Sequence, residues 1–175
     1  AHVLDLSLEA VQVRSVVIGG GFGGKSQSPE PIAIAAMLSM KTGKPVKILL
    51  NRQEEFFSGK SDHAKKMRIK SAVAADGTIL GRYTDFWVDN GAYTHMGPAY
   101  ISAVRQRNCN LYRVGAAGFD GKLVHTNKVS GGSYRGMGSP QIIWAIETQI
   151  DEIAEKLGKD KLEYLSLIHI SEPTR

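Results

Sequence analysis

Residues 19–26, Gly-Gly-Gly-Phe-Gly-Gly-Lys-Ser, form the least ordinary segment of this 175-residue chain. Five glycines surround one aromatic residue, an apolar run precedes them and a lysine follows. A backbone this bare can take positive φ angles and lets a ligand approach its N–H groups closely. The composition therefore predicts a loop that binds an anion or a cofactor.

The remaining composition is that of an ordinary globular chain, with 42% hydrophobic and 22% charged residues. No run approaches the roughly 18 apolar residues of a membrane span, and residues 1–10 lack the organisation of a signal peptide. No membrane span is therefore expected. The expected location is the cytoplasm, but the missing leader is no argument for it, because the chain does not begin with Met. The net charge of +5 is too scattered to favour nucleic acid as a partner. The single cysteine, Cys109, excludes an internal disulfide and an iron–sulfur cluster held by this chain alone.

Hydrophobic periodicity predicts an α+β fold of mixed strands and hairpins with two buried helices. The first helix is expected near residues 32–40, and the second carries an apolar stripe from Ile142 to Leu157. Asp76-Gly77 predicts a tight hairpin turn, whereas residues 94–132 indicate only short strands and loops. The expected strands are residues 11–18, 45–50, 67–74 and 78–88.

The glycine stretch fits two nucleotide-binding patterns, G-x-x-x-x-G-K-[ST] and G-x-G-x-x-G. Both patterns require a helix that begins within the motif. Pro29 and Pro31 would fall inside that helix, where each costs about 3 kcal/mol. They weaken both interpretations, and a P-loop nucleotide hydrolase built on Gly19–Ser26 remains an alternative. A cofactor-free interaction domain is a second alternative.

A second glycine-rich stretch, Gly131–Gly138, places Arg135 among glycines and leads into a helix that starts at Ser139-Pro140. With the first stretch it forms a pattern that resembles, in order and spacing, the molybdenum-binding subunit of the xanthine dehydrogenase and aldehyde oxidoreductase family. The resemblance spans residues 1–164 and rests on the segments 19–25, 44–46, 51–55, 89–93 and 133–141.

The resemblance implies a molybdenum–molybdopterin cofactor, with its cytosine dinucleotide form as one alternative for the pterin. It places the loop of Gly21, Phe22, Gly23 and Gly24 beside the cofactor, with the Phe22 backbone near molybdenum and Arg135 also at the cofactor. Bare N–H groups and a guanidinium are suited to this role, because both donate to anionic oxygen and sulfur ligands.

Two further positions face substrate in the family. Ser26 stands where the purine-oxidising members carry glutamate, and Met137 stands where they carry an aromatic residue. Both differences argue against xanthine itself. The resemblance implies oxidation of an aromatic heterocycle or an aldehyde with water as oxygen source, or reductive dehydroxylation of an aromatic CoA thioester.

The resemblance also implies a hetero-oligomer, with iron–sulfur clusters and FAD on partner domains or subunits. The family's general base, a glutamate, is expected beyond this chain, so no catalytic residue is assigned within it. Residues 1–164 are therefore expected to be a partial cofactor-binding domain that is inactive alone. Residues 165–175 resemble a translated sequencing adapter and are expected to be an artefact.

Overall fold

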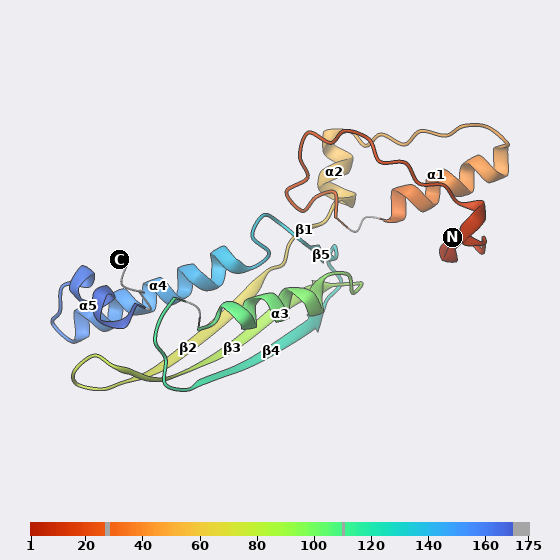
Figure 1. Ribbon diagram of the computed structural model, residues 1–175. Coiled ribbons are helices and arrows are strands. Elements are labelled where there is room, and N and C mark those ends of the chain that lie inside the picture. Colours follow the sequence, from red (N-terminus) through yellow and green to blue (C-terminus); the bar gives the residue numbers. More distant parts are fainter. Residues whose placement is uncertain (27–28, 110, 170–175) are drawn as a thin grey trace.

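A three-stranded sheet forms the main body of the computed structural model, which describes residues 1–26, 29–109 and 111–169. The sheet order is β2 (Lys65–Val73), β3 (Ile79–Gly91) and β4 (Ala117–His125) (Figure 1). Strands β2 and β3 are antiparallel, whereas β3 and β4 are parallel. Because parallel neighbours need a crossover, helix α3 (Gly97–Arg107) runs back along the sheet between them. This α+β architecture matches the predicted class.

The β2–β3 hairpin forms at the predicted turn. Gly77 takes a φ of 101°, in the left-handed region open to glycine, and the Thr78 N–H donates to the Asp76 carboxylate at 2.8 Å. Side chains of β2 alternate between partly buried and exposed, so one face of the sheet is left to receive helices.

Helices α3 and α4 (Ser139–Lys156) cover that face and enclose the core. Helix α4 buries the predicted stripe through Ile142, Ile146 and Ile150. Helix α5 (Lys161–Ile168) then packs against α4, and the Tyr164 hydroxyl donates to the Gly77 carbonyl at 3.0 Å. The largest fully buried apolar side chains are Tyr100, Tyr164, Phe86, Ile79, Ile142, Ile146, Ile150, Val88 and Val104.

The N-terminal 60 residues lie to one side of this body (Figure 1). They comprise the short 3₁₀ helices His2–Leu4 (η1) and Leu8–Ala10 (η2), helix α1 (Pro29–Thr42) and helix α2 (Arg52–Ser58). A capping box starts α2: the Asn51 side chain accepts from the Glu54 N–H, and the Glu54 carboxylate accepts from the Asn51 N–H.

Three predictions for this N-terminal part are wrong for the chain as it stands. Residues 11–18 and 45–50 are not strands, because no described segment runs beside them to complete a hydrogen-bonded ladder. Helix α1 forms as predicted but is not buried: it contacts η1, yet none of its apolar side chains between residues 30 and 42 is buried. Those exposed include Ile32, Ile34, Met37, Leu38 and Met40.

The region between residues 94 and 132 is more regular than predicted, since it holds α3 and the nine-residue strand β4. A further two-residue parallel pair joins β1 (Ser61–Asp62) to β5 (Gly131–Gly132), which ties the start of the second glycine stretch to the segment after α2. Helix α5 continues past residue 164, with Ile168 buried, whereas residues 170–175 lie outside the described residues. No helix in the described ranges is long and apolar enough to cross a membrane.

Candidate cofactor site

The first glycine loop is a pair of tight turns that point an aromatic side chain outward. The Gly24 N–H donates to the Gly21 carbonyl at 2.8 Å, and the Ser26 N–H donates to the Gly23 carbonyl at 3.0 Å. Phe22 takes a φ of 50° and Gly23 a φ of 102°. A bulky residue in the left-handed region is uncommon and costs on the order of 1–3 kcal/mol, and such conformations cluster at functional sites.

The second glycine loop repeats this design. Gly136, Met137 and Gly138 have φ angles of 93°, 42° and 81°, so again a bulky residue lies in the left-handed region beside glycine. The Met137 N–H donates to the Tyr134 carbonyl at 2.7 Å. The turn ends directly at the first residue of α4, which fixes the loop to a helix with a buried apolar stripe.

The two loops are in backbone contact. A Cβ atom added at Gly23 would lie 2.2 Å from the Ser133 carbonyl oxygen and 3.1 Å from the Tyr134 Cα, so only glycine fits there. The Arg135 guanidinium lies over the Phe22 ring, 5.7 Å from its centroid, which is a cation–π geometry. The structure thus brings together Phe22, Gly23 and Arg135 from segments more than 100 residues apart.

The surface of the paired loops is rich in donors. Within residues 1–26, 29–109 and 111–169, the N–H groups of Phe22, Gly23, Arg135 and Gly136 have no acceptor. In the same ranges no carboxylate pairs with the exposed Arg135 side chain. Unpaired N–H groups beside a guanidinium bind anionic groups rather than metal cations, so this surface fits an anionic ligand.

The other predicted site residues are placed less decisively. Gly21 and Gly24 lie within the first loop, and Ser26 is exposed at its end. Met137 is partly buried and packs against the core cluster. A substrate-facing role for Ser26 and Met137 stays a prediction.

Helix geometry contradicts the nucleotide-binding alternative. Helix α1 begins at Pro29, whereas Lys25 and Ser26 lie in a turn and a bend. A P-loop requires these two residues on the first turn of the helix, where its N–H groups point at the phosphates. The glycine stretch therefore lacks the helix that would bind a nucleotide phosphate.

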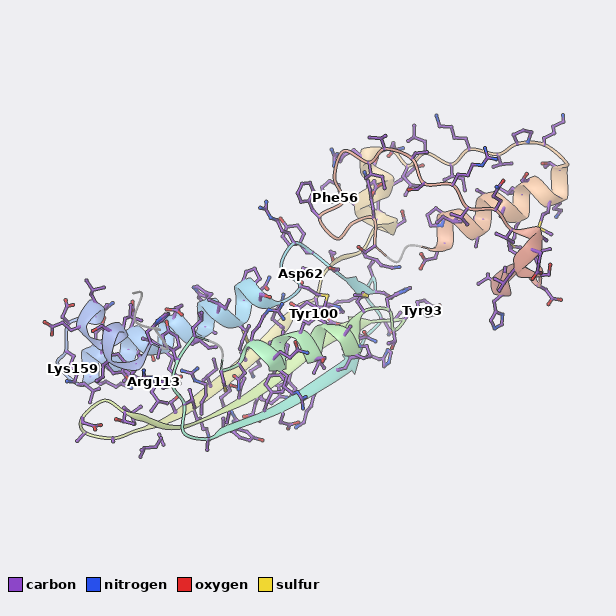
Figure 2. The ribbon with its side chains drawn as sticks, viewed as in Figure 1. Phe56, Asp62, Tyr93, Tyr100, Arg113 and Lys159 are labelled. Atoms are coloured by element: carbon purple, nitrogen blue, oxygen red, sulfur yellow. The ribbon has the colours of Figure 1, made fainter. Side chains whose placement is uncertain are left out.

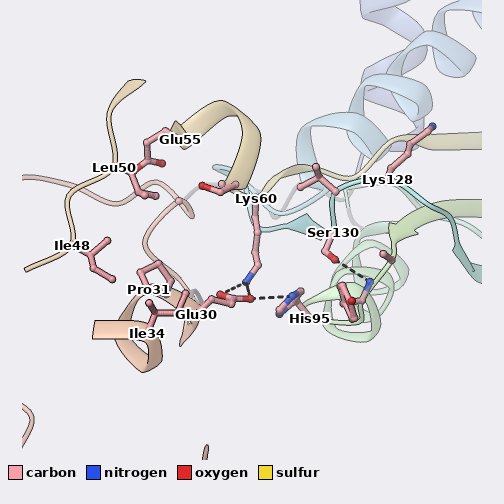
Figure 3. A pocket seen from close by; sticks show the side chains of 16 residues that line it. Glu30, Pro31, Ile34, Ile48, Leu50, Glu55, Lys60, His95, Lys128 and Ser130 are labelled. Atoms are coloured by element: carbon pink, nitrogen blue, oxygen red, sulfur yellow. Dashed lines mark hydrogen bonds and ion pairs between the residues drawn. The ribbon is translucent and has the colours of Figure 1, made fainter. Parts of the chain in front are cut away.

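A cavity of about 490 Å³ adjoins the first loop at Gly24. Figure 3 shows an ion-pair group on its wall, in which the Lys60 ammonium lies 3.2 Å and the His95 Nε2 lies 3.5 Å from the Glu30 carboxylate. A hydrogen bond from its own backbone N–H, aided by Lys60, lowers the pKa of Glu30, so this carboxylate is charged at neutral pH. The group links α1 to the segment before β1 and to the loop before α3.

Comparison with known proteins gives the family. The model of the molybdopterin cofactor-binding domain family matches residues 1–166. The chain belongs to this family. Its identification agrees with the resemblance carried by the two glycine loops, and the anion-binding surface fits a phosphate-bearing, thiolate-bearing cofactor such as molybdopterin.

Several curated proteins resemble this molybdopterin cofactor-binding domain over most of its length. The chain is 35% identical over 162 residues to the xanthine dehydrogenase molybdenum-binding subunit of Escherichia coli, covering 93% of the chain and 22% of that protein. It is 32% identical over 163 residues to the nicotinate dehydrogenase large molybdopterin subunit of Eubacterium barkeri, covering 93% and 38%. The chain thus spans only a minor part of the curated relatives it matches.

Solved structures of similar fold agree with this family assignment. The aldehyde oxidoreductase of Desulfovibrio gigas superposes with a TM-score of 0.82 at 33% identity, covering 90% of this chain and 17% of that one. Quinoline 2-oxidoreductase of Pseudomonas putida 86 gives a TM-score of 0.79 at 30% identity, covering 88% and 20%. The α+β arrangement described above is therefore that of the molybdopterin-binding domain of aldehyde oxidoreductase-type structures.

Sequence reasoning missed one part of the site. A partly buried polar cluster of Asp62, Lys65, Tyr100 and Gln141 lies next to the second loop. Gln141 lies within segment 133–141, on which the family resemblance rests. Its partners are distant in sequence and form no recognisable motif. Their association becomes visible only in the folded chain.

Proposed function

We propose that this chain is part of the molybdenum-binding subunit of a molybdenum-dependent hydroxylase. The observation that carries the proposal is the backbone contact between two strained glycine loops that together present unpaired N–H groups and Arg135. The names of the relatives support the enzyme class, since they describe xanthine and nicotinate dehydrogenases and aldehyde oxidoreductases.

Each loop has a distinct task in this proposal. The N–H groups of Phe22 and Gly23 would donate to anionic groups of the cofactor, because the glycines beside Phe22 carry no side chain that would block their approach. Arg135 donates charge-assisted hydrogen bonds from its planar fork, and the Phe22 ring holds that fork in orientation. The bound cofactor would supply the two-electron redox chemistry.

The substrate is proposed to be an aromatic heterocycle or an aldehyde, oxidised with water as oxygen source, or an aromatic CoA thioester that is reductively dehydroxylated. Ser26 and Met137 are the proposed substrate-facing residues, and their identities argue against xanthine. The pterin in its cytosine dinucleotide form is one alternative. The general base would come from the remainder of the subunit.

The proposed assembly is a cytoplasmic hetero-oligomer in which iron–sulfur clusters and FAD on partner domains or subunits carry the electrons away. Two relatives support it by name, one as a molybdenum-binding subunit and one as a large molybdopterin subunit. Residues 1–164 form the proposed cofactor-binding part, whereas an artefactual origin of residues 165–175 stays a prediction.

The test uses the full-length subunit assembled with its redox partners. Molybdenum and pterin are measured by elemental analysis and by fluorescence of the oxidised pterin. Arg135→Ala should lower cofactor content and activity by about tenfold or more, because it removes charge-assisted hydrogen bonds worth about 1.5–3 kcal/mol each. Arg113→Ala is the matched control, since Arg113 is exposed at the far end of the sheet (Figure 2). Purified enzyme without molybdenum, with activity unaffected by Arg135→Ala, would end the proposal.

A further inference from the structure

The second glycine loop contacts a partly buried chain of polar side chains. The Gln141 amide donates to the Asp62 carboxylate at 2.8 Å. The Lys65 ammonium forms an ion pair with the same carboxylate oxygen and donates to the Tyr100 hydroxyl at 2.8 Å. The four residues come from β1, β2, α3 and α4, so the cluster joins every layer of the body at one point.

Both ends of the loop contact this cluster. Asp62 pairs with Gly132 in the parallel β1–β5 ladder, at the loop's start. At its end, a Cβ added to Gly138 would lie 2.8 Å from the Tyr100 ring, so the glycine backbone sits directly on that ring. Arg135 lies three residues from each of these two contacts. The backbone that carries Arg135 is therefore in contact with the cluster on both sides.

The cluster is largely enclosed. Tyr100 is fully buried, and the Lys65 and Asp62 side chains are only 11% and 23% exposed. Burial, followed by the nearby Asp62 charge, raises the pKa of Tyr100, so its hydroxyl stays neutral and can accept from Lys65. In such surroundings, removal of one charged partner leaves the other buried and unpaired, which is strongly unfavourable.

We propose that Asp62 is a positioning residue: through Gln141 on one side and Lys65–Tyr100 on the other, it fixes the Arg135 loop against the anionic cofactor. Asp62 does not touch the cofactor and acts through Arg135. This inference rests on the proposed function. It concerns residues outside both glycine stretches, although Gln141 belongs to segment 133–141.

The test compares Asp62→Ala with Asp85→Ala in the full-length enzyme. Asp85 is a suitable control because its carboxylate is also largely covered, at 10% exposure, and pairs with Arg68 at 2.6 Å on β2, away from the loops. The readouts are the rate of pterin release and the electron paramagnetic resonance signal of the partly reduced molybdenum. Asp62→Ala should release pterin about 10–100-fold faster and shift the signal, whereas Asp85→Ala should do neither.

A double-mutant cycle separates positioning from general destabilisation. If Asp62 acts through Arg135, Asp62→Ala should accelerate release less in an Arg135→Lys background than in the wild type. Gln141→Ala removes only one link of the cluster and should give a smaller change in the same direction, which covers the case that Asp62→Ala does not fold.

The two failures are distinguishable. Wild-type enzyme that contains no pterin would overturn the proposed function. Wild-type enzyme that is loaded, with Asp62→Ala or Gln141→Ala releasing pterin at the wild-type rate, would overturn the positioning role alone. Fully additive effects of Asp62→Ala and Arg135→Lys would also overturn it.

Discussion

Replacement of Gly23 by alanine is the sharpest perturbation of the contact between the two loops. The new Cβ would lie 2.2 Å from the Ser133 carbonyl oxygen, on a backbone whose φ is 102°. An ordinary contact starts at 3.4 Å, so the loops must separate by about 1.2 Å at this point. The opposing atom belongs to the backbone and cannot rotate away as a flexible side chain would.

Two costs add at Gly23. The left-handed backbone costs about 1–2 kcal/mol once a Cβ is present, and forcing an extra methyl into a packed contact costs a further 1–3 kcal/mol, roughly. The functional loss should be larger than the stability loss, because a misplacement of about 1 Å can lower a catalytic rate about 100-fold.

Two further alanine variants separate the backbone strain from the steric clash. Gly43 has a φ of 63° but nothing within 4 Å of its added Cβ, so Gly43→Ala measures the backbone strain alone. Gly24 has its nearest neighbour at 3.5 Å and lacks a positive φ, so Gly24→Ala carries neither cost. It serves as the baseline for urea unfolding alone, because Gly24 is itself expected to lie beside the cofactor. Urea unfolding and pterin content of the full-length enzyme are the assays. If Gly23→Ala is no more destabilising than Gly43→Ala and keeps its pterin, the loops are not in contact.

Three further outcomes are expected. Arg135→Lys keeps the charge but loses the planar fork, so pterin should be released about tenfold faster in the fluorescence assay. Hydrogen bonds from Thr126 and the Gly91 N–H lower the pKa of Asp89 to about 2. The ionised carboxylate therefore contributes its full stabilisation above about pH 4, and this contribution is lost as the pH falls through 2. In Asp89→Asn, the urea midpoint of unfolding should fall less steeply between these pH values than in the wild type. Tyr112→Phe removes a donor 2.6 Å from the Glu147 carboxylate and should lower the free energy of unfolding by about 1.5–3 kcal/mol in urea titrations.

Local signals in the sequence predicted the elements whose determinants are local. The Asp76-Gly77 turn and the apolar stripe of α4 are each determined by residues within the element itself, and both lie where expected. Helix α3 was missed because only Gly97, Tyr100, Ala103 and Val104 are buried, a pattern too short to stand out in sequence. Its presence follows from the parallel pairing of β3 with β4, which is a tertiary fact.

The candidate site divides in the same way. The glycine content and the position of Arg135 predicted both loops. The family resemblance predicted that the two loops share one cofactor site. The contact of Gly23 with Ser133 and the support of Asp62 beneath could not be predicted, because each joins segments that lie tens of residues apart or more. Alternating apolar residues at 11–18 predicted a strand, but a strand forms only where a neighbour completes its ladder.

The two loops therefore depend on different supports. The second loop is anchored at both ends to buried structure, through the β1–β5 ladder and Tyr100. The first loop precedes α1, in which none of residues 30–42 is buried. Among the described residues, it meets the second loop through Gly23 on Ser133 and through the Phe22 ring against Arg135, with the Glu30 ion pairs nearby. It follows that the position of the first loop depends on the position of the second loop, which is the better anchored of the two. A substitution at Gly23 should displace the first loop alone, whereas one at Gly138 should displace both.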